Sequence, residues 1–251
     1  MSQDHSPTRP RRNFLRKLIT VASAAPLSSQ LITGASASAV AAAPAFAADM
    51  PDAPSSAPTG YQSFSADEAA FVENMVNVMC PADDYTPNGV DCGLATFIDR
   101  QLSGAFGQGA GRYMNAPWAP GKPQTGSQLP FTPEQFFKAG VEAANRLCQA
   151  KFGKTFDQLQ VAQADAFLKD ISNSTIKDDD IPLASWFNDL TYPLFEQACY
   201  ADPMYGGNRN KVFWKMIGYP GLPATHTLDM VSFRGKPYPG AKDPKSIIDF
   251  S

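Results

Sequence analysis

The chain has 251 residues, 43% of them hydrophobic and 18% charged, with a formal net charge of −3. This length and composition suit one globular domain with tails. Proteins that bind nucleic acid neutralise its phosphates with clustered lysines and arginines, and the acidic balance of this chain argues against that class.

The first segment, residues 1–47, has the pattern of a targeting peptide and is set aside before the fold is considered. Within it, Arg11 and Arg12 are followed by Phe14 and Leu15 in the run P-R-R-N-F-L-R. This spacing is typical of a twin-arginine export signal, which is an address for the twin-arginine translocase rather than an anchor.

An uncharged stretch follows from residue 18 to residue 48, and Ala45 and Ala47 in it form an A-x-A cleavage site. The alternative interpretation is a transmembrane anchor. Several serines, Pro26 and Gln30 make the stretch too polar for that role, so we predict cleavage after Ala47 and release into the periplasm. The twin-arginine route moves folded proteins, typically with a cofactor. The chain therefore either holds a cofactor or escorts a partner that does.

Four cysteines lie in the exported part of the chain: Cys80, Cys92, Cys148 and Cys199. An even number of cysteines in an oxidising compartment favours disulfides, and four allow three pairings. Cys80 and Cys92 flank a short loop and could close it. Cys148 and Cys199 would then pair with each other or with another chain.

The mature chain is expected to begin with a flexible N-terminus, the Pro-, Ala- and Ser-rich residues 48–63, and to continue as a domain over residues 64–251. The first helix of this domain is predicted to start at Ser65, which forms a capping box with Glu68, and to stop before Pro81.

Apolar residues at helical spacing predict five further helices, over residues 94–102, 133–152, 161–171, 186–198 and 211–217. The longest opens with a second capping box at Thr132 and ends at Gly153. Pro193 is expected to bend or break the helix that contains it, and Gly218 to cap the last one.

Two stretches lack any period. The Gly- and Pro-rich residues 103–130 are expected to form a long loop, and the chain from Tyr219 onward an irregular tail. No segment shows convincing strand alternation. The predicted fold is therefore all-α, a single irregular helical domain of about six helices with long loops.

Most catalytic motifs are absent from the mature chain, in which His226 is the only histidine. One histidine excludes a multi-histidine metal site and a bis-histidine haem. C-x-x-C-H and G-x-S-x-G are missing, and the glycines of residues 104–111 do not form G-x-G-x-x-G. We expect His226 to be structural and the chain to hold no catalytic, cofactor-binding or metal-binding residue, which favours an escort role.

One stretch looks like a site: residues 202–221, D-P-M-Y-G-G-N-R-N-K-V-F-W-K-M-I-G-Y-P-G. Its glycines permit a tight turn with positive φ, and an arginine can bind a carboxylate with two hydrogen bonds. Tyrosine and tryptophan supply much of the energy of protein interfaces. The turn either contacts a partner or packs internally. The candidate residues are Asp202, Tyr205, Gly206, Gly207, Asn208, Arg209 and Trp214.

Together with the twin-arginine leader, the run M-C-P-A-D-D and the run G-L-A-T-F-I-D-R-Q-L-S-G, this stretch resembles the small (gamma) subunit of gluconate 2-dehydrogenase, the subunit 3 family. The resemblance covers roughly residues 62–225, and its most specific element is the stretch 202–221. Many members lack cysteine where this chain has Cys80 and Cys92, so the resemblance does not support a bridge there.

The resemblance implies a non-catalytic subunit without a cofactor of its own. Its partners would be a large flavoprotein of the GMC type, which carries FAD and oxidises a sugar or sugar acid, and a multihaem cytochrome c. The cytochrome, with its haem c groups, would hold the complex at the periplasmic face of the inner membrane. The small subunit would export and stabilise the flavoprotein. Two alternatives stay open: a stand-alone periplasmic enzyme that uses His226, and a solitary binding or structural module.

Overall fold

The computed structural model describes residues 60–116, 118, 122, 129–222 and 226–250. All of them belong to one compact unit of the chain. The predicted signal peptide and most of the predicted flexible N-terminus lie outside the described residues. So do the residues named for export and cleavage: Arg11, Arg12, Phe14, Leu15, Ala45 and Ala47.

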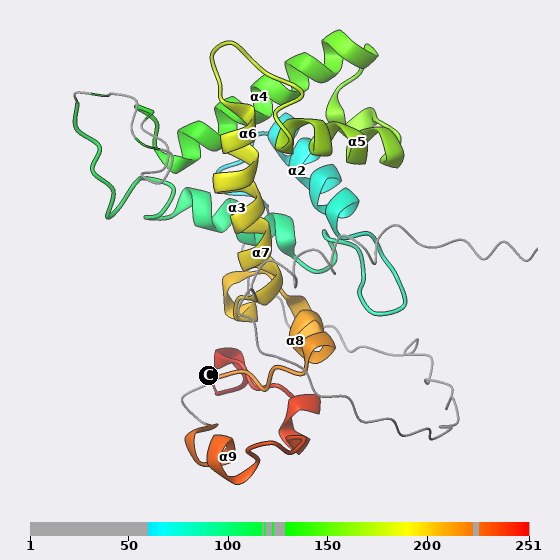
Figure 1. The fold of residues 1–251 in the computed structure, drawn as a ribbon, viewed down its shortest axis with the longest axis vertical. Coiled ribbons are helices and arrows are strands. Elements are labelled where there is room, and N and C mark those ends of the chain that lie inside the picture. Colours follow the sequence, from blue (N-terminus) through cyan, green and yellow to red (C-terminus); the bar gives the residue numbers. More distant parts are fainter. Residues whose placement is uncertain (1–59, 117, 119–121, 123–128, 223–225, 251) are drawn as a thin grey trace, which may run out of the picture. The chain divides into compact units, whose positions relative to one another are not determined.

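The described part of the chain is helical, and its one β feature is an isolated bridge between Gly221 and Lys245. The all-α prediction is confirmed (Figure 1). The α-helices are α2 (Ala66–Met79), α3 (Leu94–Ser103), α4 (Pro133–Phe152), α5 (Val161–Ser172), α6 (Leu183–Ser185), α7 (Tyr192–Tyr200), α8 (Val212–Ile217) and α9 (Thr227–Ser232).

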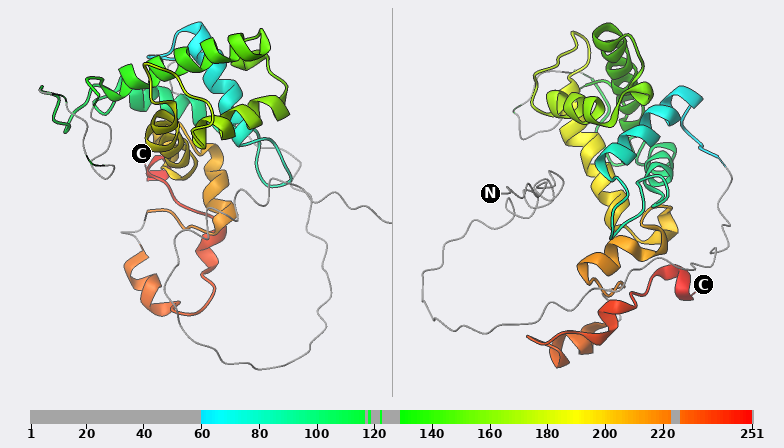
Figure 2. Two further views of the ribbon diagram at one scale, coloured as in Figure 1. Left: turned by 45° about the horizontal axis from the view of Figure 1, so that its top comes forward. Right: turned by 90° about the vertical axis from the view of Figure 1, so that its right-hand side faces the viewer.

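Shorter elements connect these helices. The 3-10 helices are η2 (Phe156–Gln158), η4 (Pro203–Tyr205), η5 (Arg209–Lys211), η7 (Pro239–Lys242) and η8 (Ile247–Phe250), and η3 (Trp186–Thr191) is a π-helix. From the core helices α7 leads to α8, and the C-terminal residues lie beyond α8, away from α4 and α5 (Figures 1 and 2). Within the described residues, no helix is both long and apolar enough to cross a membrane.

The helix ends follow the local signals in the sequence. The Ser65 side chain accepts a hydrogen bond from the N–H of Glu68, whose carboxylate accepts one from the N–H of Ser65. Thr132 caps α4 in the same way. Gly153 and Gly218 end α4 and α8 in the left-handed conformation, with φ of 68° and 70°. These ends were predictable because each capping bond joins residues within one turn.

The helix around Pro193 is not broken, because α6, η3 and α7 follow one another without a gap. Proline has no N–H, and its ring would collide with the carbonyl four residues earlier in a regular α-helix. The π-helix Trp186–Thr191 widens the turn just before Pro193 and so accommodates the ring.

The core is centred on Trp186, which is fully buried. Its indole N–H donates to the carbonyl of Phe137 on α4, at 3.0 Å. Gly140 on the same helix is required by this contact, because a Cβ there would lie 2.2 Å from the indole ring. Phe71 on α2 stands against the ring with centroids 6.2 Å apart. One side chain thus joins three elements of the core.

The C-terminal segment is more regular than predicted. Instead of an irregular tail, it forms α9, η7 and η8 and the bridge to Gly221. A helix of six residues such as α9 has too few turns to show a helical period in the sequence. In the predicted long loop, residues 104–112 form successive hydrogen-bonded turns.

Candidate functional site

The stretch 202–221 forms a compact turn between α7 and α8. It opens with Asp202, whose carboxylate accepts a hydrogen bond from the N–H of Met204 at 3.0 Å and so caps η4. Gly206 follows in the left-handed region, with φ of 100°. The chain then turns through η5 into α8.

Glycine is required where the turn meets two helices. A Cβ on Gly207 would lie 2.4 Å from the carbonyl oxygen of Ala198 on α7. A Cβ on Gly93, the residue before α3, would lie 2.2 Å from the carbonyl oxygen of Gly206. Backbone therefore packs on backbone here, which only glycine permits.

Asn208 is fully buried, and its side chain holds the turn together by hydrogen bonds within it. Its side-chain amide donates to the carbonyl of Ala201 at 3.1 Å, and its side-chain oxygen accepts from the N–H of Phe213 at 3.0 Å. These two bonds join the end of α7 to the start of α8. Its backbone φ of 45° is left-handed, a region that asparagine tolerates better than most residues.

Arg209 joins the turn to α3. Its backbone N–H donates to the carbonyl of Cys92 at 3.0 Å, and its guanidinium donates to the hydroxyl of Thr96 at 3.3 Å. The side chain remains exposed, and among the described residues no carboxylate pairs with it. The guanidinium is therefore accessible to a carboxylate outside this part of the chain.

Trp214 is buried, with 4% of its surface exposed, and its indole N–H donates to the carbonyl of Tyr200 at 2.8 Å. Tyr205, by contrast, is 46% exposed. The structure brings all seven candidate residues into one turn. It uses Gly207, Asn208 and Trp214 as the internal framework and leaves Tyr205 and Arg209 at the surface.

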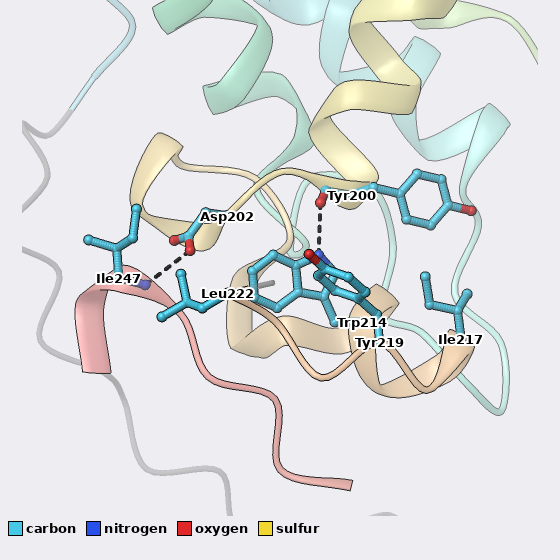
Figure 3. A pocket seen from close by; sticks show the side chains of 7 residues that line it. All are labelled: Tyr200, Asp202, Trp214, Ile217, Tyr219, Leu222 and Ile247. Carbon is cyan, nitrogen blue, oxygen red and sulfur yellow. Dashed lines mark hydrogen bonds between the residues drawn. The ribbon is translucent and has the colours of Figure 1, made fainter. Parts of the chain in front are cut away.

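Beside this turn lies a pocket of about 360 Å³ (Figure 3). Its lining is mostly apolar, and its one carboxylate, Asp202, is already occupied: it accepts from the N–H of Ile247 at 3.0 Å as well as from Met204. The lining residues are Tyr200, Asp202, Trp214, Ile217, Tyr219, Leu222 and Ile247.

The C-terminal segment completes this pocket by folding back on the turn. The N–H of Lys245 donates to the carbonyl of Pro220 at 2.9 Å, and Lys211 forms an ion pair with Asp249. Partial burial raises the pKa of Asp249, but the Lys211 ammonium and the N–H of Ser246 outweigh it and bring the pKa below the usual value. Asp249 is therefore held as a carboxylate.

Sequence reasoning missed the contributions of Tyr200, Leu222 and Ile247 to this pocket. Ile247 lies 45 positions from Asp202 along the chain, and no local period relates the two. A signal would have required an alignment of related chains in which the two positions vary together.

The structure corrects the disulfide prediction, because Cys80, Cys92, Cys148 and Cys199 are all buried free thiols. Cys80 and Cys92 do lie together, and both donate to the carbonyl of Pro87, at 3.9 and 3.6 Å. The proximity of Cys92 lowers the pKa of Cys80, while the proximity of Cys80 and burial raise that of Cys92.

Cys148 on α4 and Cys199 on α7 are inside the core. Burial raises the pKa of Cys148 to about 12 and also raises that of Cys199. Burial in apolar surroundings favours the neutral, unreactive thiol, so neither residue is available to another chain.

His226 lies in a small cluster next to α9. Its Nδ1 is 3.0 Å from a carboxylate oxygen of Asp229, which also accepts from the hydroxyl of Tyr238 at 3.0 Å. These contacts join α9 to the residues that follow it. In the described part of the chain, no group of three or more side chains could hold a metal ion.

Comparison with known proteins identifies the region that contains this turn. The family model described as Gluconate 2-dehydrogenase subunit 3 matches residues 66–221, more than half of the chain. The match begins with α2 and ends at Gly221, so the C-terminal segment that completes the pocket lies beyond it. Neither the search of curated proteins nor the search of solved structures returned a match.

Proposed function

Because the chain belongs to the gluconate 2-dehydrogenase subunit 3 family, we propose that it is the non-catalytic small subunit of a periplasmic, flavin-dependent dehydrogenase complex. The main observation that supports this is the family match over residues 66–221. The catalytic partner would be a GMC-type flavoprotein with FAD, which oxidises D-gluconate to 2-dehydro-D-gluconate or acts on fructose, sorbitol or glucose. A multihaem cytochrome c would receive the electrons at the inner membrane.

The chemistry of the pocket supports a binding role rather than sugar oxidation. Trp214, Leu222 and Ile247 give it an apolar lining, whereas a sugar acid needs hydrogen-bond donors and positive charge. The carboxylate of Asp202 would repel gluconate, and the backbone N–H groups of Met204 and Ile247 occupy its oxygens. This surface suits apolar side chains of another protein.

The leader supports a second task. The family's flavoprotein has no leader of its own, so the twin-arginine pattern at Arg11 and Arg12 would export the folded pair. The small subunit would then stabilise the flavoprotein in the cytoplasm, accompany it across the membrane and remain bound to it in the periplasm.

Co-purification tests the proposal. The full-length chain, tagged at its C-terminus, is expressed in its native host and isolated from solubilised membranes. We expect a flavin-containing protein and a cytochrome c to purify with it, and the eluate to oxidise gluconate or one of the related sugars. A chain that purifies alone from periplasm and membranes would favour a solitary binding module instead. Turnover by the isolated chain would contradict a non-catalytic role.

A further inference from the structure

Large exposed apolar side chains gather in the C-terminal fifth of this chain. Of fifteen such residues in the described part of the chain, eleven lie between positions 200 and 250. Exposed apolar patches that are contiguous in space mark interaction sites, so what matters is which of these side chains lie together. The eleven are Tyr200, Met204, Tyr205, Met216, Ile217, Leu228, Met230, Val231, Ile247, Ile248 and Phe250.

Three of the eleven line the pocket described above, from three different parts of the chain. Tyr200 is 44% exposed, Ile217 is 55% exposed and Ile247 is 43% exposed, while Trp214 beneath them is almost fully buried. Figure 3 shows Tyr200 and Ile217 on one side of Trp214 and Ile247 on the other. We call these four residues, with the pocket they line, the pocket surface.

The charge of this region differs from that of the rest of the domain. Residues 202–251 contain seven basic and four acidic residues, whereas residues 61–201 contain nine basic and 17 acidic residues. All four carboxylates of the segment accept hydrogen bonds from within it; they are Asp202, Asp229, Asp243 and Asp249.

The basic side chains are less engaged. Several are exposed and have no carboxylate partner among the described residues; they are Lys215, Arg234, Lys236 and Lys242. Lys215 lies on α8, two residues before Ile217. The charge that this segment presents outward is therefore positive.

We propose that the pocket surface is where the catalytic flavoprotein subunit docks, which rests on the function proposed above. The partner inserts an apolar side chain into the pocket between Ile217 and Ile247, and sets acidic side chains against the exposed basic side chains of this segment, Lys215 among them. A second copy of the chain fits less well, because a two-fold contact would place basic groups against basic groups. A lipid surface fits less well too, because a concave pocket receives a protruding side chain.

The first test places a charge on the pocket surface. Ile217→Glu is introduced into the tagged full-length chain in its native host, and the flavin that purifies with each chain is measured. Val161→Glu on α5 is the matched control, since Val161 is 58% exposed and lies outside this surface. We expect about a tenfold loss of flavin for Ile217→Glu, the effect of a hot-spot residue, and none for the control. Thermal unfolding of both variants checks that they are folded.

The second test changes the charge without altering the apolar contact. Lys215→Glu is compared with the same change at Lys154, an exposed lysine between α4 and α5. We expect Lys215→Glu to lower the recovered flavin several-fold in low salt and much less in high salt, because salt screens exposed charges. Lys154→Glu should leave recovery unchanged at either salt concentration.

The outcomes separate the two proposals. If the unsubstituted chain recovers no flavoprotein, the proposed function is wrong, and this proposal is wrong with it. If the unsubstituted chain does recover flavoprotein and both Ile217→Glu and Lys215→Glu recover as much, only the docking surface is wrong. Self-association of the purified chain that Ile217→Glu abolishes would assign the surface to a second copy. Binding to phosphatidylglycerol vesicles that the same variant loses would assign it to lipid.

Discussion

The two buried side-chain hydrogen bonds of Asn208 predict that Asn208→Ala strongly destabilises the mature chain. The substitution leaves the carbonyl of Ala201 and the N–H of Phe213 without their partner, in a place where Asn208 itself is fully buried. An unsatisfied buried group costs about 1–3 kcal/mol, so the two together cost about 2–6 kcal/mol. With an m-value of about 2 kcal/mol/M, the urea midpoint should fall by roughly 1–3 M.

The neighbouring Asn210 provides the control. It also has a left-handed backbone, with φ of 58°, but its side chain is exposed. Alanine at either position therefore carries the same backbone strain of roughly 1–2 kcal/mol, and only Asn208→Ala loses the buried bonds. Urea unfolding followed by tryptophan fluorescence compares the two variants. Equal midpoints would refute the reasoning that the side-chain bonds of Asn208 hold the turn together.

Three further predictions follow from other parts of the molecule. Changing Arg11 and Arg12 to lysine should leave dehydrogenase activity in the cytoplasmic fraction; normal periplasmic activity would contradict the escort role. Gly140→Ala should lower stability by about 1–3 kcal/mol, measured by urea unfolding, because its Cβ would collide with Trp186. Asp249 has a lowered folded pKa, so its contribution to holding the C-terminal segment is present above the usual aspartate pKa of about 3.9 and is lost as the pH falls through the lower folded value. Lower amide protection factors in residues 246–250 below that pH should report the loss, and Asp249→Asn should show the same low protection at neutral pH.

Local signals made most of the helices predictable. The two capping boxes and the glycines after α4 and α8 act through bonds within a single turn, and the structure confirms each of them. The twin-arginine pattern stays a prediction, because its residues lie outside the described part of the chain. The family was predictable as well, because the sequence motif at residues 202–221 is specific to it. The family match confirms this prediction.

Other features depended on contacts between distant residues. Pro193 predicted a bend or break, and the structure shows no break but a π-helix just before the proline, within which Trp186 packs against α4. The cysteine count suggested disulfides, yet the structure buries Cys148 and Cys199 as free thiols on two different helices. Composition alone could predict neither result, because each depends on what lies beside the residue in space.

By itself, the sequence determined the helical class, the positions of the main helices and the family, because all three are encoded in residues close together along the chain. Only the tertiary structure decided that Asn208 and Trp214 face inward, and that the exposed apolar groups of Tyr200, Ile217 and Ile247 meet at one pocket. A turn with the same sequence could expose either face to solvent. Its orientation is set by backbone packing against α3 and α7 and by the hydrogen bond from Ile247 to Asp202, which join residues far apart in the sequence.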